Sequence, residues 1–146
     1  MTRFISAVAV AALGLATISG CSISVNGDEK ESVTRQFGND YVGIGGMVNL
    51  TDPVAGDAFL AAGQIAIASE VQGDLVAAGG EVSIGGSVGD DLYAAGGDVQ
   101  LDAMVTGNAR IAGGDVQVGP ATVIAGAVSL TGGRITFDGN SHGYLQ

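Results

Sequence analysis

The sequence has no tryptophan, one cysteine, one histidine and only five basic residues. With aromatic residues at 5%, it cannot build a globular core around large side chains. One cysteine permits neither an intrachain disulfide nor a cysteine-based zinc site. His142 is the one histidine, so we expect neither a histidine-based catalytic relay nor a metal site built from histidines. We therefore expect no catalytic residues, no metal site, no cofactor and no enzymatic activity.

Fifteen acidic residues outnumber the basic ones and give a net charge of −10. Phosphate backbones and anionic lipid head groups are bound by clustered lysine and arginine, so we expect no nucleic-acid partner. Hydrophobic residues nevertheless make up 47% of the chain, and 26 residues are glycine. This composition excludes a disordered polar chain and suits a narrow aliphatic core with glycine at its corners.

The glycines belong to an internal repeat. Related phrases begin at residues 39, 56, 73, 90, 107 and 126, so the interval is 17 four times and then 19. Residues 73–89 (GDLVAAGGEVSIGGSVG) and 90–106 (DDLYAAGGDVQLDAMVT) illustrate the match. A period of this length indicates one structural unit stacked on copies of itself.

Equivalent positions of the repeats hold aliphatic residues in pairs spaced by two, which is typical of short strands with alternate side chains inward. Two such columns are Val48, Ile65, Val82, Val99, Val116, Ile135 and Leu50, Ile67, Ile84, Leu101, Val118, Phe137. The pattern predicts an all-β fold, a single-stranded parallel β-helix (β-solenoid) of about six coils of 17 residues over 39–142. Residues 143–146 are then a C-terminal tail.

Glycine fills one column in all six repeats, which indicates positive φ or a close backbone approach at a corner. The members are Gly46, Gly63, Gly80, Gly97, Gly114 and Gly133. Within one coil the inward spacings from Leu75 to Val88 are 2, 5, 2 and 4, which favours a right-handed helix over the left-handed hexapeptide type. The two extra residues near 120–122 are expected to form an outward loop.

Residues 1–20 have the layout of a secretory signal peptide, with Arg3 before an apolar stretch at 4–18. This stretch is shorter than the ~20 residues that cross a bilayer. Ile18, Ser19, Gly20 and Cys21 resemble the lipobox of bacterial lipoproteins, although an ordinary exported protein with a chance cysteine remains the alternative. The resemblance implies that Cys21 is lipidated and anchors the chain in a membrane.

Ser22 follows the cysteine, which in the enterobacterial sorting rule implies the outer membrane, with the inner membrane as the alternative. The polar segment after Cys21 lacks the repeat, so we expect 21–38 to be the lipidated cysteine and a flexible tether. In the alternative, 22–25 form a short strand that caps the stack.

The phrase GD-L-x-AAGG-x-V-x-L/I at 73–84 and 90–101 resembles the bactofilins, the polymer-forming cytoskeletal β-helix proteins. The resemblance covers 39–138. It implies a right-handed β-helix that polymerises end to end without nucleotide and associates with membranes through its N-terminal tail. Familiar members act in the cytoplasm, whereas a lipobox would place this domain in the cell envelope.

A solenoid ends in unpaired backbone groups and an open apolar core, which natural proteins usually cap. We expect a homo-oligomer or polymer in which the first and last coils meet through Val48, Leu50, Ile135 and Phe137. The predicted function is a lipid-anchored structural or scaffold protein of the envelope. The alternative is a surface binding module for a glycan, a divalent cation or another envelope protein, and a polysaccharide lyase ranks third.

Two columns carry that alternative. Aspartates 40, 57, 74 and 91 line up, continued by Asn108, and Asp57, Asp74 and Asp91 are the candidate cation ligands. We favour turn-capping by these side chains, because the glycine and aspartate spacing of calcium-binding solenoids is absent. Phe59, Val76, Tyr93 and Arg110 share an outward column that could hold a glycan, although scattered surface aromatic residues are more common.

Overall fold

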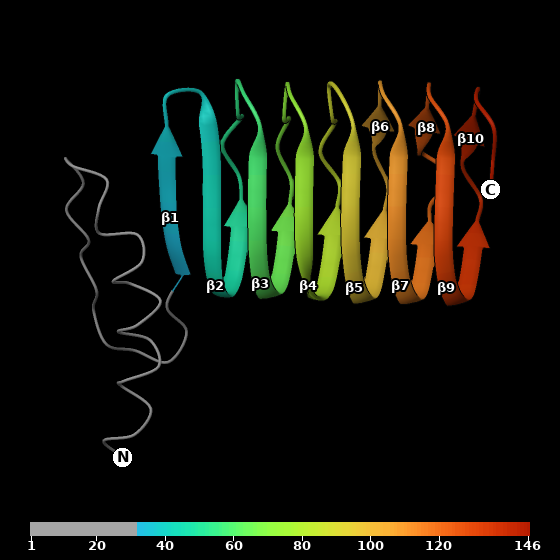
Figure 1. Cartoon of the computed structure of the whole chain (residues 1–146), viewed down its shortest axis with the longest axis horizontal. Helices are drawn as coiled ribbons and strands as arrows, with labels where there is room; N and C mark the ends of the chain where they lie inside the picture. The colour runs from blue at the N-terminus through green and yellow to red at the C-terminus, as the bar shows by residue number, and fades with distance from the viewer. Residues whose placement is uncertain (1–31) are drawn as a thin grey trace, which may run out of the picture.

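The computed structural model describes residues 32–146 as a rod of stacked coils (Figure 1). One long strand from each coil lies beside its neighbours in a single sheet, and these strands are β2 (Asp40–Leu50), β3 (Ala58–Ile67), β4 (Leu75–Ile84), β5 (Leu92–Leu101), β7 (Ala109–Val118) and β9 (Val128–Phe137). A second sheet contains β6 (Met104–Val105), β8 (Val123–Ile124) and β10 (Asn140–Ser141). The predicted β-solenoid is thus confirmed, while its right-handed winding remains a prediction.

Neighbouring coils pair in parallel with a shift of one repeat. Ala77 pairs with Ala94, and Val82 pairs with Val99. The side chains of Val82 and Val99 are 0% and 1% exposed. The predicted aliphatic columns therefore form the interior, because parallel pairing in this register places equivalent side chains over one another.

Each long strand turns a corner at its glycines. In β4 the side chains of Leu75 and Ala77 point inward, and after the glycines at 79 and 80 the inward positions become Val82 and Ile84. The interval of five between Ala77 and Val82 arises because the alternation of inward and outward side chains is interrupted at this corner. Residues 32–146 contain no helix of the length and hydrophobicity that a bilayer crossing requires.

The glycine column is explained by close approach and not by positive φ. In the described residues only Gly38 has positive φ, at 62°. A Cβ added at Gly63 would lie 2.9 Å from the carbonyl oxygen of Gly46, and one at Gly97 would lie 3.0 Å from that of Gly80. Neighbouring coils are therefore so close at this corner that a side chain would push against the backbone of the preceding coil.

The two-residue insertion in the fifth coil differs in part from the predicted outward loop at 120–122. Pro120 and Ala121 are exposed, as expected for an outward loop, but Thr122 is 0% exposed. Its hydroxyl donates to the carbonyl oxygen of Leu101 at 2.9 Å and accepts from the amide of Ala103 at 3.3 Å. Thr122 thus returns the chain to the inner wall, where its hydroxyl bonds the backbone of the preceding coil.

The tether expected over 21–38 is wrong for its last part. Residues Ser32–Phe37 form strand β1, which pairs antiparallel with β2 from Phe37↔Asp40 to Ser32↔Gly45. The link is a two-residue turn of Gly38 and Asn39, and the positive φ of Gly38 fits a tight hairpin. Local pairing with β2 therefore orders this segment, and β1 covers part of the first coil (Figure 1).

The predicted tail at 143–146 is also corrected. The amide of Val128 donates to the carbonyl oxygen of Tyr144 at 2.8 Å, and the amide of Gln146 donates to that of Val128 at 2.9 Å. Leu145 forms a parallel bridge with Val128. The chain after 142 therefore starts a further coil, because β9 offers unpaired backbone groups to it.

Candidate functional surfaces

The lipobox residues and the cysteine expected to carry lipid lie outside the described part of the chain. The lipobox residues are Ile18, Ser19 and Gly20, and the lipidated residue is Cys21. The alternative capping strand at 22–25 also lies outside it. The surfaces that can be described are an acidic ladder, the two ends of the rod and a groove on its outer face.

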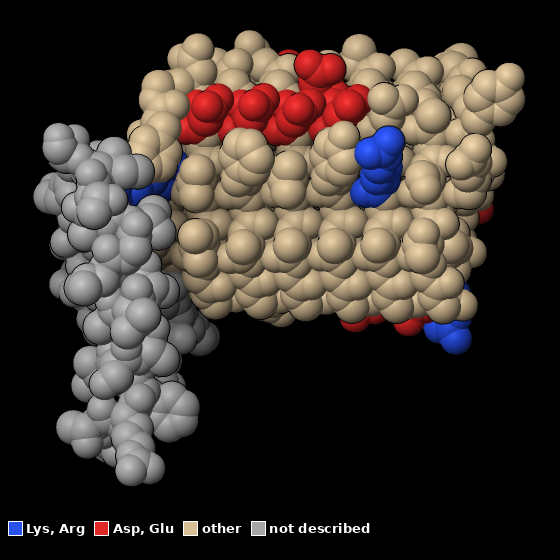
Figure 2. Space-filling view, viewed as in Figure 1, with Lys and Arg blue, Asp and Glu red and all other residues tan. Residues whose placement is uncertain are grey.

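The acidic ladder runs along the rod at the beginnings of the long strands and is visible as a row of acidic side chains in Figure 2. Each carboxylate accepts a hydrogen bond from the backbone amide one coil further on. The bonds to the Oδ1 atoms of Asp40, Asp57, Asp74 and Asp91 measure 3.0, 2.9, 3.0 and 2.7 Å. Asn108 continues the ladder, since its Oδ1 atom accepts from the amide of Ala127 at 2.9 Å.

This geometry confirms the predicted turn-capping. The coil turns at these positions, and the side-chain oxygen satisfies an amide that would otherwise lack a strand partner. Asp57, Asp74 and Asp91 are therefore engaged with the backbone of the next coil. Within 32–146 no three or more histidine, cysteine, aspartate or glutamate residues are grouped to hold a metal ion.

A second polar column contains Gln64, Glu81, Asp98 and Asp115 and ends at Arg134. The amide nitrogen of Gln64 donates to Glu81 at 3.2 Å, and Arg134 lies 3.3 Å from Asp115. These contacts are exposed, so the ion pair contributes about 0–1 kcal/mol. They relieve repulsion at both ends of the acidic stretch.

The two ends of the rod differ. Val48 and Leu50 in the first coil are each 1% exposed, so neither side chain forms an accessible contact surface. In the last coil Ile135 is 42% exposed and Phe137 is partly buried, although Val116 and Val118 one coil below are each 1% exposed. The aliphatic interior therefore reaches solvent at the last coil.

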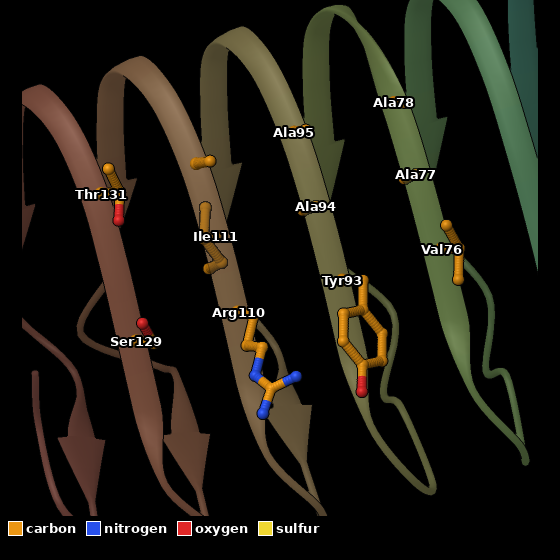
Figure 3. Close-up of a pocket in the computed structure, with 11 residues that line it drawn as sticks. Val76, Ala77, Ala78, Tyr93, Ala94, Ala95, Arg110, Ile111, Ser129 and Thr131 are labelled. Atoms are coloured by element: carbon orange, nitrogen blue, oxygen red, sulfur yellow. The ribbon is translucent and has the colours of Figure 1, made fainter.

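A groove of about 300 Å³ lies on the outer face, over β4, β5, β7 and β9 (Figure 3). Two outward columns line most of it, namely Val76, Tyr93, Arg110, Ser129 and Ala78, Ala95, Ala112, Thr131. Because alanine is short and Tyr93 and Arg110 are long, the face is hollowed beside the larger side chains. A second hollow of about 390 Å³ adjoins it at Arg110 and Ser129 and reaches Tyr144 and Gln146.

Tyr93 and Arg110 lie next to each other on the groove. The guanidinium carbon of Arg110 is 5.7 Å from the centre of the Tyr93 ring, within the range of a cation–π interaction. The sequence placed both residues in one outward column with Phe59, and the structure confirms that register. The sequence did not reveal the contact between Arg110 and Tyr93, since a column fixes which side chains are neighbours but not how they are oriented.

Comparisons with protein-family models, with curated proteins and with solved structures each gave no match to this chain. The fold class is nevertheless defined by the structure, which is a parallel β-solenoid. The likeness to bactofilins therefore depends on the residues of the repeat alone.

Proposed function

We propose that this protein is a lipid-anchored structural scaffold of the bacterial cell envelope, similar to bactofilins, that self-associates through the ends of its rod. The membrane anchor in this proposal is Cys21, and the outer membrane is the preferred location because Ser22 follows it. The rod from 32 to 146 then acts by its shape and its surfaces rather than by chemistry.

The observation that supports self-association best is the exposure of the last coil. Ile135 is 42% exposed, whereas Val116, the member of the same column in the preceding coil, is 1% exposed. Residues 144–146 pair with the beginning of β9, up to Leu130, so a second solenoid placed on the rest of β9 would continue both the parallel pairing and the aliphatic column. A solenoid end that is only partly covered favours association, as an open strand edge does in general.

The first coil would contribute differently from what the sequence predicted. Since Val48 and Leu50 are buried, a partner at that end would meet β1, and the part of β2 that β1 leaves unpaired begins after Gly45. End-to-end growth would therefore join the exposed Ile135 and Phe137 of one copy to the first coil of the next through β1 and the part of β2 after Gly45, and not through Val48 and Leu50.

Sedimentation velocity of the purified protein tests the association. We expect elongated oligomers that dissociate in Ile135→Asp, because the substitution places a carboxylate in the contact. Thr136→Asp, at the exposed neighbouring position, is the matched control and should still associate. Filaments in negative-stain images would agree with this, whereas a strict monomer at high protein concentration would remove the proposal.

Membrane fractionation tests the anchor. Cys21→Ala in the full chain should release the protein from the membrane fraction while leaving its β-sheet circular dichroism spectrum unchanged. Each buried methylene of a lipid chain contributes ~0.8 kcal/mol, so loss of all acyl chains removes the attachment. If the variant still fractionates with membranes after a high-salt wash, the lipid anchor is wrong.

A further inference from the structure

The groove on the outer face extends along the rod and not across it. Its column of Val76, Tyr93, Arg110 and Ser129 takes one residue from each of four successive coils. At ~4.8 Å per coil the three steps span about 14 Å. The second hollow continues the path from Arg110 and Ser129 to Tyr144. A site of this form suits a chain-like ligand better than a compact one.

We propose that this groove binds a linear, uncharged, β-1,4-linked polysaccharide that lies parallel to the rod axis. The proposal goes beyond the scaffold role and does not depend on self-association. It gives the acidic rod a third partner, besides the membrane and the other copies of itself that the scaffold proposal names.

Exposed aromatic rings of this outward column provide the stacking surface, with Tyr93 in the lining of the groove and Phe59 one coil beyond Val76 at its β4 end. Phe59 is 44% exposed and Tyr93 is 37% exposed, and Val76 lies between them in the same column. The two rings are thus two coils apart, about 9.6 Å. The face of an aromatic ring is electron-rich and packs against the polarised C–H bonds of a sugar. In an extended β-1,4 chain every second sugar presents the same face, so rings on every second coil would meet equivalent faces.

Polar groups beside the rings match the hydroxyl groups of sugars. Arg110 offers several N–H donors, and the hydroxyls of Ser129 and Thr131 both donate and accept. The guanidinium of Arg110 also packs on the Tyr93 ring, which limits the orientations of that ring (Figure 3). Stacking and hydrogen bonding are therefore available along the same path.

Other ligands fit the groove less well. Nucleic acids and anionic lipids are bound by several cations, whereas Arg110 is the one charged residue in the lining and the chain carries a net charge of −10. A peptide that adds a strand needs a free sheet edge, but β5 and β7 are paired on both sides. A neutral, hydroxyl-rich chain requires neither clustered cations nor a free sheet edge.

Isothermal titration calorimetry of the purified full chain tests the proposal with β-1,4-linked glucose and N-acetylglucosamine oligomers. Affinity should rise from the disaccharide to the hexasaccharide in at least one series. Tyr93→Ala should weaken hexasaccharide binding about tenfold, the value of one aromatic contact. Tyr93→Phe should retain binding, and Arg110→Ala should lower it. Met104→Ala, exposed in the other sheet, is the matched control.

Circular dichroism of each variant separates loss of binding from loss of fold. The proposal is overturned if neither series binds the wild-type protein, or if Tyr93→Ala binds as tightly as wild type. It is also overturned if Tyr93→Ala changes the sedimentation of the protein but not its affinity for sugars, since the groove would then be a contact between copies. These outcomes leave the scaffold proposal untouched, because its test changes Ile135 in the last coil.

Discussion

At the scale of single residues, Val99 shows that the aliphatic interior has no place for a charged side chain. Its side chain is 1% exposed and stacks between Val82 and Val116. We predict that Val99→Asp abolishes folding, because an unpaired buried carboxylate costs several kcal/mol and a small domain has only ~5–15 kcal/mol to lose. Gln100→Asp, one residue on and exposed, should stay folded. Urea unfolding followed by circular dichroism checks both, and a folded Val99→Asp would contradict the aliphatic ladder.

The acidic ladder makes a second prediction at this scale. Asp74 accepts a hydrogen bond from the amide of Asp91, so Asp74→Ala should lower the free energy of unfolding by about 1 kcal/mol. Asp74→Asn keeps the acceptor oxygen, as Asn108 does naturally, and should cost less. Urea denaturation compares the two.

A chelator distinguishes capping from cation binding. If the ladder acts through backbone hydrogen bonds alone, EDTA should leave the melting temperature of the wild-type protein unchanged. A lower melting temperature on chelation would instead show that the stacked aspartates hold a cation.

Thr122 is the residue on which the irregular coil depends. Its hydroxyl bonds both the carbonyl of Leu101 and the amide of Ala103, and it is fully buried. Thr122→Val preserves shape but removes the acceptor of the Ala103 amide, while the carbonyl of Leu101 keeps its bond from the amide of Gly119. We therefore expect a loss of about 1–3 kcal/mol in thermal or urea unfolding. Thr122→Ser keeps the hydroxyl and should lose less; equal losses would show that the hydrogen bonds contribute little.

At the scale of elements, the β1–β2 hairpin depends on its turn. Gly38 has φ of 62°, so Gly38→Ala should destabilise the hairpin by about 1–2 kcal/mol. Hydrogen exchange of the β1 amides should quicken while that of β5 stays slow, since β5 is several coils away. Asn39→Ala, at the turn position without positive φ, is the control and should have a smaller effect. Equal exchange in both variants would argue against a strained turn.

This hairpin also shows a limit of the repeat as a predictor. Residues 32–37 do not follow the 17-residue pattern, so they were assigned to a tether, yet they pair with β2 over its first six residues. The dipeptide Gly38-Asn39 was the available signal, since it is a two-residue hairpin turn. Antiparallel pairing next to a tight turn needs no repeat, which is why the columns could not reveal it.

At the scale of the whole molecule, stability should be a sum over coils and their neighbours. Deleting 73–89 removes one period and joins equivalent positions, so the shortened chain should keep its β-sheet spectrum with a lower free energy of unfolding. Deleting 73–81 instead shifts every later column by about half a coil and should prevent folding. Circular dichroism and urea unfolding of both deletions test this, and a folded out-of-register chain would contradict the stacking of equivalent residues.

The sequence by itself determined the coil length, the parallel register and the identity of the inner columns. It could do so because each coil meets only its neighbours, so a side chain that fits once fits again at the same position of the next coil. The tertiary structure alone decided how β1 covers the first coil, how Thr122 re-enters the wall and how Arg110 packs on Tyr93. Those features depend on the orientation of particular side chains and on the ends of the stack, where no neighbouring copy constrains the chain.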